Sequence, residues 1–477
     1  MHGIYMTFVI IYEIIVIIAV LHVVMSNRQP VKTMAWALVI YFVPVAGIVL
    51  YLFFGLDTRK ERLIGERSLN QLTKRSMLGF VGQQNLRVPD GVKPLVDLFV
   101  NQSFSLPFKD NAVEIFTEGS SFFLDLLKSI GAAKSSIHID MYIFADDALG
   151  YLVADALIDK ARSGVEVRVI YDDVGCWNVS HSFFERMREE GIEVSPFLPV
   201  RFPSFTSKVN YRNHRKIIVI DGRVAYIGGM NIALRYVKGI DGQEWRDTMV
   251  RITGGVVYSV QKAFLVDWYF VDRTLISSTK YYPSMDDAVR NDGIAQIVTS
   301  GPVSEYPDIM QGYVRVILGA RKYVYIESPY FLPTEPVLFA LVTAALGGID
   351  VRVLVPWRSD SRFVEWAGRS YMRDVMNAGV KIYRYNSGFL HSKFMLADDS
   401  VATVGSTNVD FRSFENNFEA NVFFFDTDVV RRFKSVFMSD ISVSELLNDK
   451  PPVVRGRFRS FFVRLWESLI RLLSPLL

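Results

Sequence analysis

Two polar stretches of the sequence carry the same residue types at the same spacing. In chain order they read His214, Lys216, Asp221, Gly228 and Asn231 in the first copy, and His391, Lys393, Asp398, Gly405 and Asn408 in the second. The spacing from the histidine to the glycine is identical in the two copies, and so is the spacing from the histidine to the asparagine. Two copies of one polar pattern predict a single site that is assembled from both parts of the chain.

Each copy offers an imidazole beside an ammonium group, because residues two apart on a strand project from the same face. Two ammonium groups with the amides of Asn231 and Asn408 suit a phosphodiester anion, and would stabilise the charge of a five-coordinate transition state. One histidine can attack phosphorus while the other, protonated, donates to the leaving oxygen. Two histidines beside two lysines are too few ligands for catalytic zinc, so we expect no metal and no other cofactor.

A histidine that acts as a base or a nucleophile needs a partner that orients its ring. Asp247 follows His214 further along the first half and Glu419 follows His391 further along the second, and both are candidates for this role. The aspartates of the repeated pattern, Asp221 and Asp398, fall at turns and on the opposite strand parity from the lysines. On geometry alone, these two aspartates are expected to be structural carboxylates.

Around these motifs, short β-branched runs alternate with amphipathic stretches, which is typical of an α/β sheet. The first half is predicted to contain strands over 113–116, 136–144, 165–171 and 192–196, and helices over 122–130, 149–162 and 181–190. The second half repeats this order. Gly164–Val169 matches Gly348–Val353, Gly191–Val194 matches Gly379–Ile382, and Ile137–Asp140 matches Val324–Glu327, with nearly the same separation along the chain each time. Ordered matches around a repeated motif indicate a duplicated α/β unit.

The composition narrows the class of protein. The chain has 477 residues, of which 50% are hydrophobic, a net charge of +3 and one cysteine, Cys176. This length suggests about two or three domains, and the excess of apolar residues suggests that part of the chain faces lipid. The mild charge provides no concentrated basic face, so nucleic acid is not expected as a partner. A single cysteine forms neither an intrachain disulfide nor a cysteine-rich zinc site.

The N-terminus contains two apolar runs of membrane-spanning length, over 7–25 and 33–56, and together they predict a transmembrane hairpin. The loop between the runs holds Arg28 and Lys32. Six basic residues follow the second run: Arg59, Lys60, Arg62, Arg67, Lys74 and Arg75. Because basic residues are enriched on the cytoplasmic side of membrane proteins, the main body is expected on the cytoplasmic face.

The predicted organisation therefore has five parts. They are a transmembrane hairpin over residues 1–57, a juxtamembrane linker over 58–110, two α/β halves over 111–290 and 291–447, and a C-terminal tail over 448–477. The tail combines apolar residues at helical spacing with arginines at 457, 464 and 471, which predicts an amphipathic helix. Such a helix fits a membrane interface, and it equally fits packing on the catalytic body or on a second copy in a homo-oligomer.

The paired motifs resemble those of the phospholipase D superfamily. Within it, the hydrophobic N-terminus with Trp36, Pro44 and residues Tyr51–Gly55, together with Gly228–Asn231, is similar to the bacterial cardiolipin synthases of the phospholipase D type. The resemblance covers nearly the whole chain and implies two phospholipase D-like α/β halves that share one active site. It also implies a multi-pass protein of the bacterial cell membrane that converts two phosphatidylglycerol molecules into cardiolipin and glycerol through a phosphohistidine.

By the same resemblance, catalysis is assigned to His214, Lys216, Asp221, His391, Lys393 and Asp398, with His214 as nucleophile and His391 as general acid and base. A hydrolytic phospholipase D or a nuclease is the alternative, because both would use the same histidines and lysines. A membrane scaffold with a degenerate site is disfavoured, since both motif copies are intact. No motif distinguishes transfer to a lipid hydroxyl from hydrolysis.

Overall fold

The structure is a computed structural model that describes residues 2–25, 30–43, 45–51, 55, 86–200, 210–240, 242–276, 278–285, 291, 293–447, 457–472 and 474. The chain divides into two compact units, one of residues 1–62 with 200–211 and one of residues 63–199 with 212–477. Several predicted features lie outside the described residues: Pro44, residues 52–54 and 56–57 of the hairpin, residues 58–85 of the linker, and residues 448–456 of the tail.

The described part of the first unit is helical, with α1 (His2–Met25), α2 (Pro30–Phe42) and α3 (Ala46–Leu50). Val16, Val23, Ile40 and Tyr51 form its small buried cluster. The second predicted apolar run is not one helix, because α2 ends at Phe42 and Val45 has a φ of 60° before α3 begins. A proline at 44 is consistent with this break, since proline disfavours helix in the residue before it. Among the described residues, no helix combines the length and apolarity that crossing a membrane requires.

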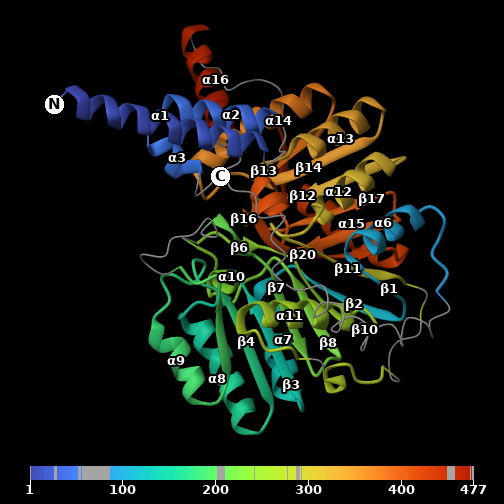
Figure 1. Ribbon diagram of the computed structural model, residues 1–477. Coiled ribbons are helices and arrows are strands. Elements are labelled where there is room, and N and C mark those ends of the chain that lie inside the picture. Colours follow the sequence, from blue (N-terminus) through green and yellow to red (C-terminus); the bar gives the residue numbers. More distant parts are fainter. Residues whose placement is uncertain are drawn as a thin grey trace. The chain divides into compact units, whose positions relative to one another are not determined.

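The second unit contains two large sheets, in cyan to green for the first half and yellow to red for the second (Figure 1). The first sheet is built from β2 (Asn111–Phe116), β3 (Ser136–Met141), β4 (Glu166–Asp172), β5 (Glu193–Phe197), β7 (Lys216–Ile220), β8 (Val224–Gly228) and β10 (Met249–Gly254). The main strands of the second are β11 (Ala295–Ser300), β12 (Tyr323–Glu327), β14 (Asp350–Pro356), β15 (Lys381–Tyr385), β17 (Phe394–Ala397), β18 (Val401–Gly405) and β20 (Asn417–Phe424).

The strand orders of the two sheets show the duplication directly. The first runs β2-β10-β8-β7-β3-β4-β5, and the second contains β11-β20-β18-β17-β12-β14-β15, which is the same order once strands are matched along the chain. In the first sheet, β3, β4 and β5 are parallel to one another and β7 is antiparallel to β3. In the second, β12, β14 and β15 are parallel and β17 is antiparallel to β12. The predicted α/β fold with two duplicated halves is therefore confirmed.

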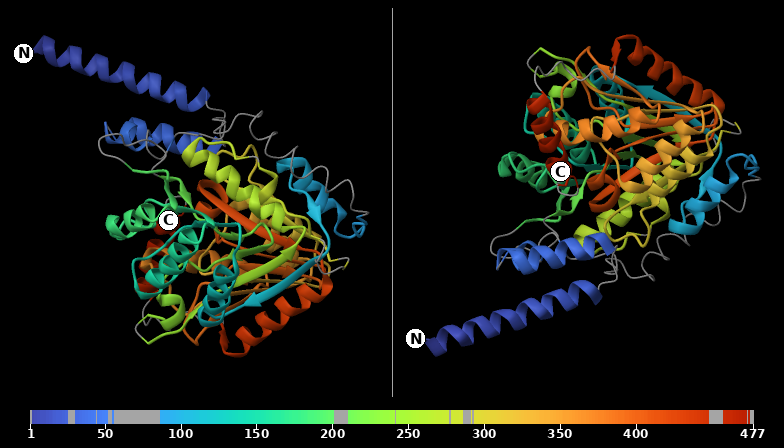
Figure 2. Two further views of the ribbon diagram at one scale, coloured as in Figure 1. Left: turned by 90° about the horizontal axis from the view of Figure 1, so that it is seen from below. Right: turned by 90° about the horizontal axis from the view of Figure 1, so that it is seen from above.

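Helices cover both sheets, as the views from below and above show (Figure 2). The first half contributes α7 (Gly119–Ala132), α8 (Ala148–Arg162), α9 (His181–Glu189) and α11 (Val257–Asp272), and the second α12 (Asp308–Gly319), α13 (Glu335–Leu346), α14 (Arg362–Asn377) and α15 (Thr427–Ser442). Their ends follow from the sequence. The Asp147 carboxylate caps α8 by accepting the Leu149 and Gly150 amides at 3.1 and 3.0 Å, and Gly164, with a φ of 87°, turns the chain after it.

Strand alternation builds the cores. In β7, Ile217 and Val219 face a central core that also contains α11, α15 and residues of the second sheet, whereas Ile218 and Ile220 face the outer core under α7, α8 and α9. The two halves thus share one central hydrophobic core.

Part of the predicted linker belongs to this body, because α6 (Lys93–Ser103) joins the outer core of the second half and β1 (Pro107–Phe108) pairs with β11.

Candidate active site

Each motif histidine lies just before a strand rather than within it, which corrects the prediction that the histidine and lysine share one strand. His214 stands between β6 (Arg212–Asn213) and β7, and His391 stands between β16 (Phe389–Leu390) and β17. The reason is that β6 and β16 leave their own sheets to pair with the opposite half. β6 runs parallel to the start of β20, and β16 runs parallel to β9 (Trp245–Arg246).

These two exchanged strand pairs place each histidine beside a carboxylate of the other half. His214 Nδ1 lies 3.0 and 3.1 Å from the carboxylate oxygens of Glu419, and His391 Nδ1 lies 2.7 Å from Asp247 Oδ2. Both predicted carboxylates therefore contact a histidine, but with partners opposite to those that sequence proximity suggested. The site is consequently a joint product of the two halves.

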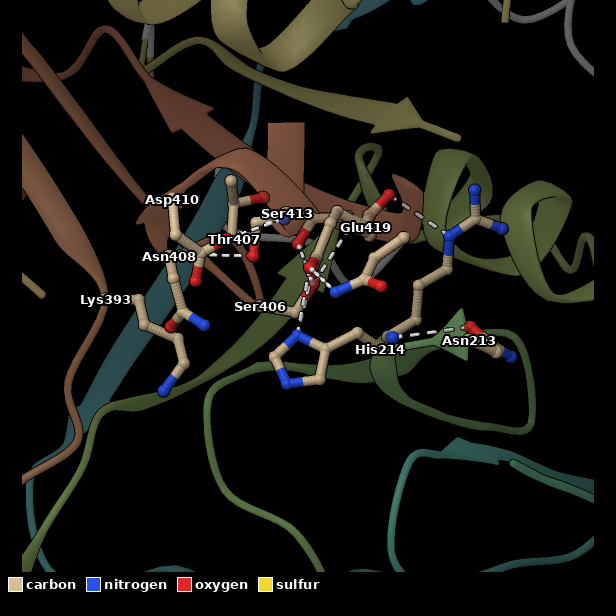
Figure 3. A network of polar contacts seen from close by, with 12 residues as sticks. Asn213, His214, Lys393, Ser406, Thr407, Asn408, Asp410, Ser413 and Glu419 are labelled. Carbon is tan, nitrogen blue, oxygen red and sulfur yellow. Dashed lines mark hydrogen bonds and ion pairs between the residues drawn. The ribbon is translucent and has the colours of Figure 1, made fainter. Parts of the chain in front are cut away.

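Further groups hold the two carboxylates. Ser406 Oγ donates a hydrogen bond to Glu419, and the Thr248 N–H donates to Asp247 Oδ1 at 2.7 Å. Figure 3 shows the His214 ring, Glu419 and Ser406 gathered with Lys393 and Asn408 of the second motif. Ser406 has no counterpart in the first half, where Gly229 stands. A Cβ atom at Gly229 would lie 2.1 Å from the Asp247 carboxylate, so the closeness of Asp247 requires glycine there.

The two lysines are buried beside the histidines. Lys216 Nζ donates to the His214 carbonyl at 2.6 Å, and Lys393 Nζ donates to the His391 carbonyl and lies 3.8 Å from Asp247. Burial lowers the pKa of Lys216 to about 7, against the opposing effect of Glu419, and it lowers the pKa of Lys393 as well. Burial alone would raise the pKa of Asp247, but Lys393 and His391 outweigh it, so this carboxylate stays ionised.

Both histidines are neutral at pH 7. Burial, reinforced by the nearby ammonium groups, lowers the pKa of His214 to about 4 and that of His391 to about 3. Asp247 and Lys393 Nζ, the latter at 2.8 Å, both approach His391 Nδ1. Because an ionised carboxylate can only accept a hydrogen bond, the contacts with Glu419 and Asp247 require the proton of each ring on Nδ1, and we assign it there. Each Nε2 then keeps a lone pair for chemistry.

A cavity of about 550 Å³ contains both histidines. Its walls come from both halves and include the predicted asparagines, Asn231 and Asn408. The Asn231 amide is already engaged, because its Oδ1 accepts from the Ile143 N–H at 3.0 Å and its Nδ2 donates to the Tyr236 hydroxyl at 2.7 Å. Asn231 therefore shapes the wall, whereas Asn408 Oδ1 is buried with no hydrogen-bond partner among the described residues.

Known proteins match this chain over nearly its whole length. A family described as cardiolipin synthase, PLD-like domain, matches residues 126–268 and 313–441, and one described as phospholipase D-nuclease N-terminal matches residues 14–55. The chain is 36% identical over 474 residues to the major cardiolipin synthase of Bacillus subtilis, with 97% of each chain covered. It is 39% identical over 477 residues to a cardiolipin synthase of Oceanobacillus iheyensis, with 96% of each chain covered.

The chain belongs to the cardiolipin synthases of the phospholipase D superfamily. The fold of the chain is also similar to that of a solved structure. The crystal structure of phosphatidylserine synthase from Haemophilus influenzae has a TM-score of 0.63 at 13% identity, covering 81% of this chain and 100% of that one. Among the described residues, no three His, Cys, Asp or Glu side chains are grouped so that they could hold a metal ion.

The family motif assigns catalysis to Asp221 and Asp398, but the structure places both at the far end of the motif strand. Seven residues of extended chain, roughly 20 Å, separate each aspartate from its histidine. The Asp221 carboxylate accepts the backbone N–H groups of Lys134, Ser135 and Ser136 at 2.9, 2.7 and 2.9 Å. Asp398 does the same with Arg321, Lys322 and Tyr323. We therefore correct the prediction of a catalytic role, since both aspartates join the motif hairpin to the neighbouring strand.

Replacing Asp221 or Asp398 with alanine is accordingly expected to destabilise the fold by about 2–3 kcal/mol, because three backbone donors lose a charged acceptor. The kcat of the folded fraction should stay within about threefold of the unchanged protein, since nothing in the cavity moves. Thermal unfolding and turnover measured on the same preparations check both statements. A loss of kcat above 100-fold with unchanged stability would restore the catalytic role to these residues.

Three arginines line the cavity wall: Arg212, Arg235 and Arg412. Two of them follow the motif asparagines at the same spacing, Arg235 after Asn231 and Arg412 after Asn408. Extending the repeated pattern beyond the asparagine would have found them. Their guanidinium groups add to the positive charge that a phosphodiester would meet.

Two more arginines hold the chain that carries the orienting carboxylates. Arg215 Nε donates to the Glu419 carbonyl at 3.1 Å, and Arg246 Nη1 donates to the Asp247 carbonyl at 2.9 Å. Each is itself ion-paired to an aspartate of a helix, Arg215 with Asp267 of α11 and Arg246 with Asp440 of α15 at 2.7 Å. The backbone of both orienting carboxylates is therefore held in the same way, by an arginine that is ion-paired to a helix.

The buried ammonium of Lys216 should reduce stability at neutral pH. The folded protein loses this proton near pH 7, whereas an unfolded lysine keeps it to about pH 10.4. The unfolded state therefore binds more protons between these values, and the stability of the unchanged protein rises with pH across this window. Lys216→Met should abolish turnover yet stabilise the fold by about 1–2 kcal/mol at pH 7.

This gain should shrink as the pH rises towards 10, because losing the Lys216 proton on folding costs less the closer the pH lies to the pKa of an unfolded lysine. Thermal unfolding between pH 6 and 9 measures it. Lys238→Met, at an exposed lysine, is the matched control and should show no such trend. Equal stability changes for the two variants at every pH would contradict a costly buried charge at Lys216.

Proposed function

We propose that this protein transfers a phosphatidyl group from one phosphatidylglycerol to a second, producing cardiolipin and glycerol. The observation that carries the proposal is a cavity with two histidines, each oriented by a carboxylate of the opposite half and flanked by a lysine. The family relatives named cardiolipin synthase support this substrate class. Residues 111–290 and 291–447 act as the two catalytic halves in this proposal.

In the first step, His214 Nε2 attacks the phosphorus of the donor lipid. A P–N bond forms, the P–O bond to the glycerol headgroup breaks, and protonated His391 supplies the proton that the departing glycerol oxygen needs. Lys216 and Lys393 stabilise the negative charge on the five-coordinate phosphorus. The product of this step is a phosphatidyl-histidine and free glycerol.

In the second step, a hydroxyl of the headgroup of a second phosphatidylglycerol attacks the same phosphorus. Neutral His391 accepts the proton of this hydroxyl, a new P–O bond forms, and the P–N bond to His214 breaks. Cardiolipin leaves and both histidines return to their starting state. If water attacked instead, phosphatidic acid would form, which is the hydrolytic alternative.

His391 must carry a proton when glycerol leaves, although the protein groups around it lower its pKa to about 3. The bound phosphodiester raises the pKa of His391, because its negative charge offsets the two ammonium groups and favours the protonated ring. The pKa of Lys216 should rise from about 7 for the same reason. Substrate binding and proton uptake are therefore coupled in this mechanism.

The experiment that tests the function incubates the purified protein with phosphatidylglycerol vesicles, with and without a chelator, and identifies the products by mass spectrometry. Cardiolipin and glycerol in equal amounts, unaffected by the chelator, agree with the proposal. Phosphatidic acid as the only lipid product would establish hydrolysis instead. Loss of activity in the chelator would overturn the metal-free mechanism.

The proposal places the protein at the cell membrane, anchored through the N-terminal hairpin with the catalytic body on the cytoplasmic side. The apolar runs of the sequence, the family match over residues 14–55 and the basic residues after the second run support it. Cysteines placed at Ser26 and Ser68 test the topology with a membrane-impermeant thiol reagent in whole cells. Labelling at Ser26 and not at Ser68 is expected, and the reverse pattern would place the body outside.

A further inference from the structure

The C-terminal helix α16 (Arg457–Arg471) is attached to the catalytic body through one edge. Arg373 of α14 ion-pairs with Glu467 at 2.5 Å, and Arg471 ion-pairs with Asp374 and lies 4.0 Å from the centre of the Tyr371 ring. Glu467 and Ile470 are buried in this contact. The ion pairs and the buried Ile470 hold α16 beside α14, so the predicted tail packs on the body.

The opposite side of the same helix is apolar and exposed. Its large side chains are Leu465, Trp466, Leu469 and Leu472, whose exposed fractions are 43%, 50%, 48% and 75%. At 100° per residue these four positions form one continuous stripe, and Ser468 and Arg464 border it on one side. A helix that only covered a core would turn this stripe inwards. Here Leu465, Leu469 and Leu472 are exposed, and one edge of the stripe meets α14 where Trp466 contacts Trp366.

We propose that this stripe, called the α16 apolar face, inserts into the headgroup and upper acyl region of an anionic phospholipid bilayer. The charge of the helix favours this occupant, because residues 457–471 contain four arginines and one glutamate. Amphipathic helices of this kind lie in the plane of the interface, with leucine and tryptophan among the acyl chains and arginines at the phosphates. The surface thus fits an anionic bilayer by both its polarity and its charge.

The position of the α16 apolar face relative to the cavity gives it a role in substrate delivery, and this part rests on the proposed function. Ser361 and Val364, at the start of α14, line the catalytic cavity. One turn further along α14, Trp366 contacts Phe363, which is 51% exposed, and also contacts Trp466 of α16, with ring centres 5.8 and 6.1 Å apart. Trp466, Trp366 and Phe363 thus run from the face to the first turn of α14, where Val364 lines the cavity, and in this proposal a lipid leaves the bilayer along them.

The first test uses a fluorescent label whose emission shifts to shorter wavelength in an apolar environment. Leu469→Cys and, as the matched control one position along the helix, Ser468→Cys are labelled in the full-length protein, since Cys176 is buried. The proteins are placed in phosphatidylglycerol nanodiscs with and without lipids that carry a nitroxide quencher on the acyl chain. We expect a blue shift and at least twofold quenching at position 469, and neither at position 468.

Two results would overturn the proposal. Emission typical of water at position 469 would show that the face does not enter lipid. A blue shift at 469 that the lipid-borne quencher leaves unchanged would show that protein covers the face, either a second copy of the chain or the helices of the N-terminal unit. Both outcomes are independent of whether the protein makes cardiolipin.

The second test separates this surface from the chemistry. Leu465→Glu combined with Leu469→Glu should lower the turnover of phosphatidylglycerol in vesicles at least tenfold. The same variant should keep its turnover of a short-chain phosphatidylglycerol that is dissolved as monomers, because the cavity is unchanged. Ser468→Glu is the control and should retain both activities. Equal loss on both substrates would contradict a role in docking, and absence of cardiolipin from the unchanged protein would refute the proposed function instead.

Discussion

Replacement of His214 by alanine is expected to lower kcat for cardiolipin formation by about 10,000-fold or more, and the same loss is expected for His391→Ala. The first change removes the atom that would carry the phosphatidyl group, and the second removes the group that moves protons to and from the glycerol oxygens. Turnover of phosphatidylglycerol in vesicles, followed by mass spectrometry, measures both losses. Retention of near-normal rates by either variant would refute a site shared between the two halves.

A substrate with a better leaving group separates the two histidines. Phosphatidyl-p-nitrophenol releases a stable anion and needs no proton from the enzyme in the first step. The His391→Ala variant should therefore release about one nitrophenolate per enzyme and then stall with a phosphatidyl group on the protein. His214→Ala should release none. Intact-protein mass spectrometry detects the trapped adduct. Its appearance in the His214→Ala variant would show that His391 is the nucleophile and His214 the general acid.

The second large effect is expected at the orienting carboxylates. Glu419→Gln and Asp247→Asn preserve shape but remove the charge that holds each Nδ1 proton, and each should lower kcat by about 100- to 10,000-fold. Glu189→Gln, at an exposed glutamate of α9, is the matched control and should be neutral. Loss of thermal stability is measured in parallel, so that unfolding is not mistaken for a catalytic defect.

The exchange of partners between the halves makes this prediction specific. Because Glu419 contacts His214, Glu419→Gln should suppress the nitrophenolate burst. Because Asp247 contacts His391, Asp247→Asn should leave the burst in place and slow the complete reaction with phosphatidylglycerol. The opposite assignment, with Asp247→Asn abolishing the burst, would show that each carboxylate serves the histidine of its own half.

Much of the fold could be predicted from the sequence because its signals are local. The strand over 165–171 appears as β4 (Glu166–Asp172), and the helix over 149–162 appears as α8 (Ala148–Arg162). Such elements are specified by periodicity and by residues next to their ends, such as Asp147 and Gly164. The repeated spacing of the two motifs was equally visible, and it sufficed to indicate one site in two halves.

Strand parity was less reliable near the site. It correctly separated Asp221 and Asp398 from the histidines, yet it assumed that His214 and Lys216 share a strand. The structure ends the local pairing at β6, whose partner is β20 of the other half. A two-residue strand is too short for its sequence to indicate its partner strand. No local pattern therefore predicts that the pairing changes at β6.

The sequence by itself determined the inventory of this site: two histidines, two lysines, and the carboxylates of Asp247 and Glu419. Only the tertiary structure decided which carboxylate meets which histidine, because those contacts join residues 205 and 144 positions apart in the chain. It also decided that Leu465, Leu469 and Leu472 of α16 are exposed. Both outcomes depend on which surfaces meet after the chain has folded, and the strength of such contacts is not encoded in any neighbouring residues.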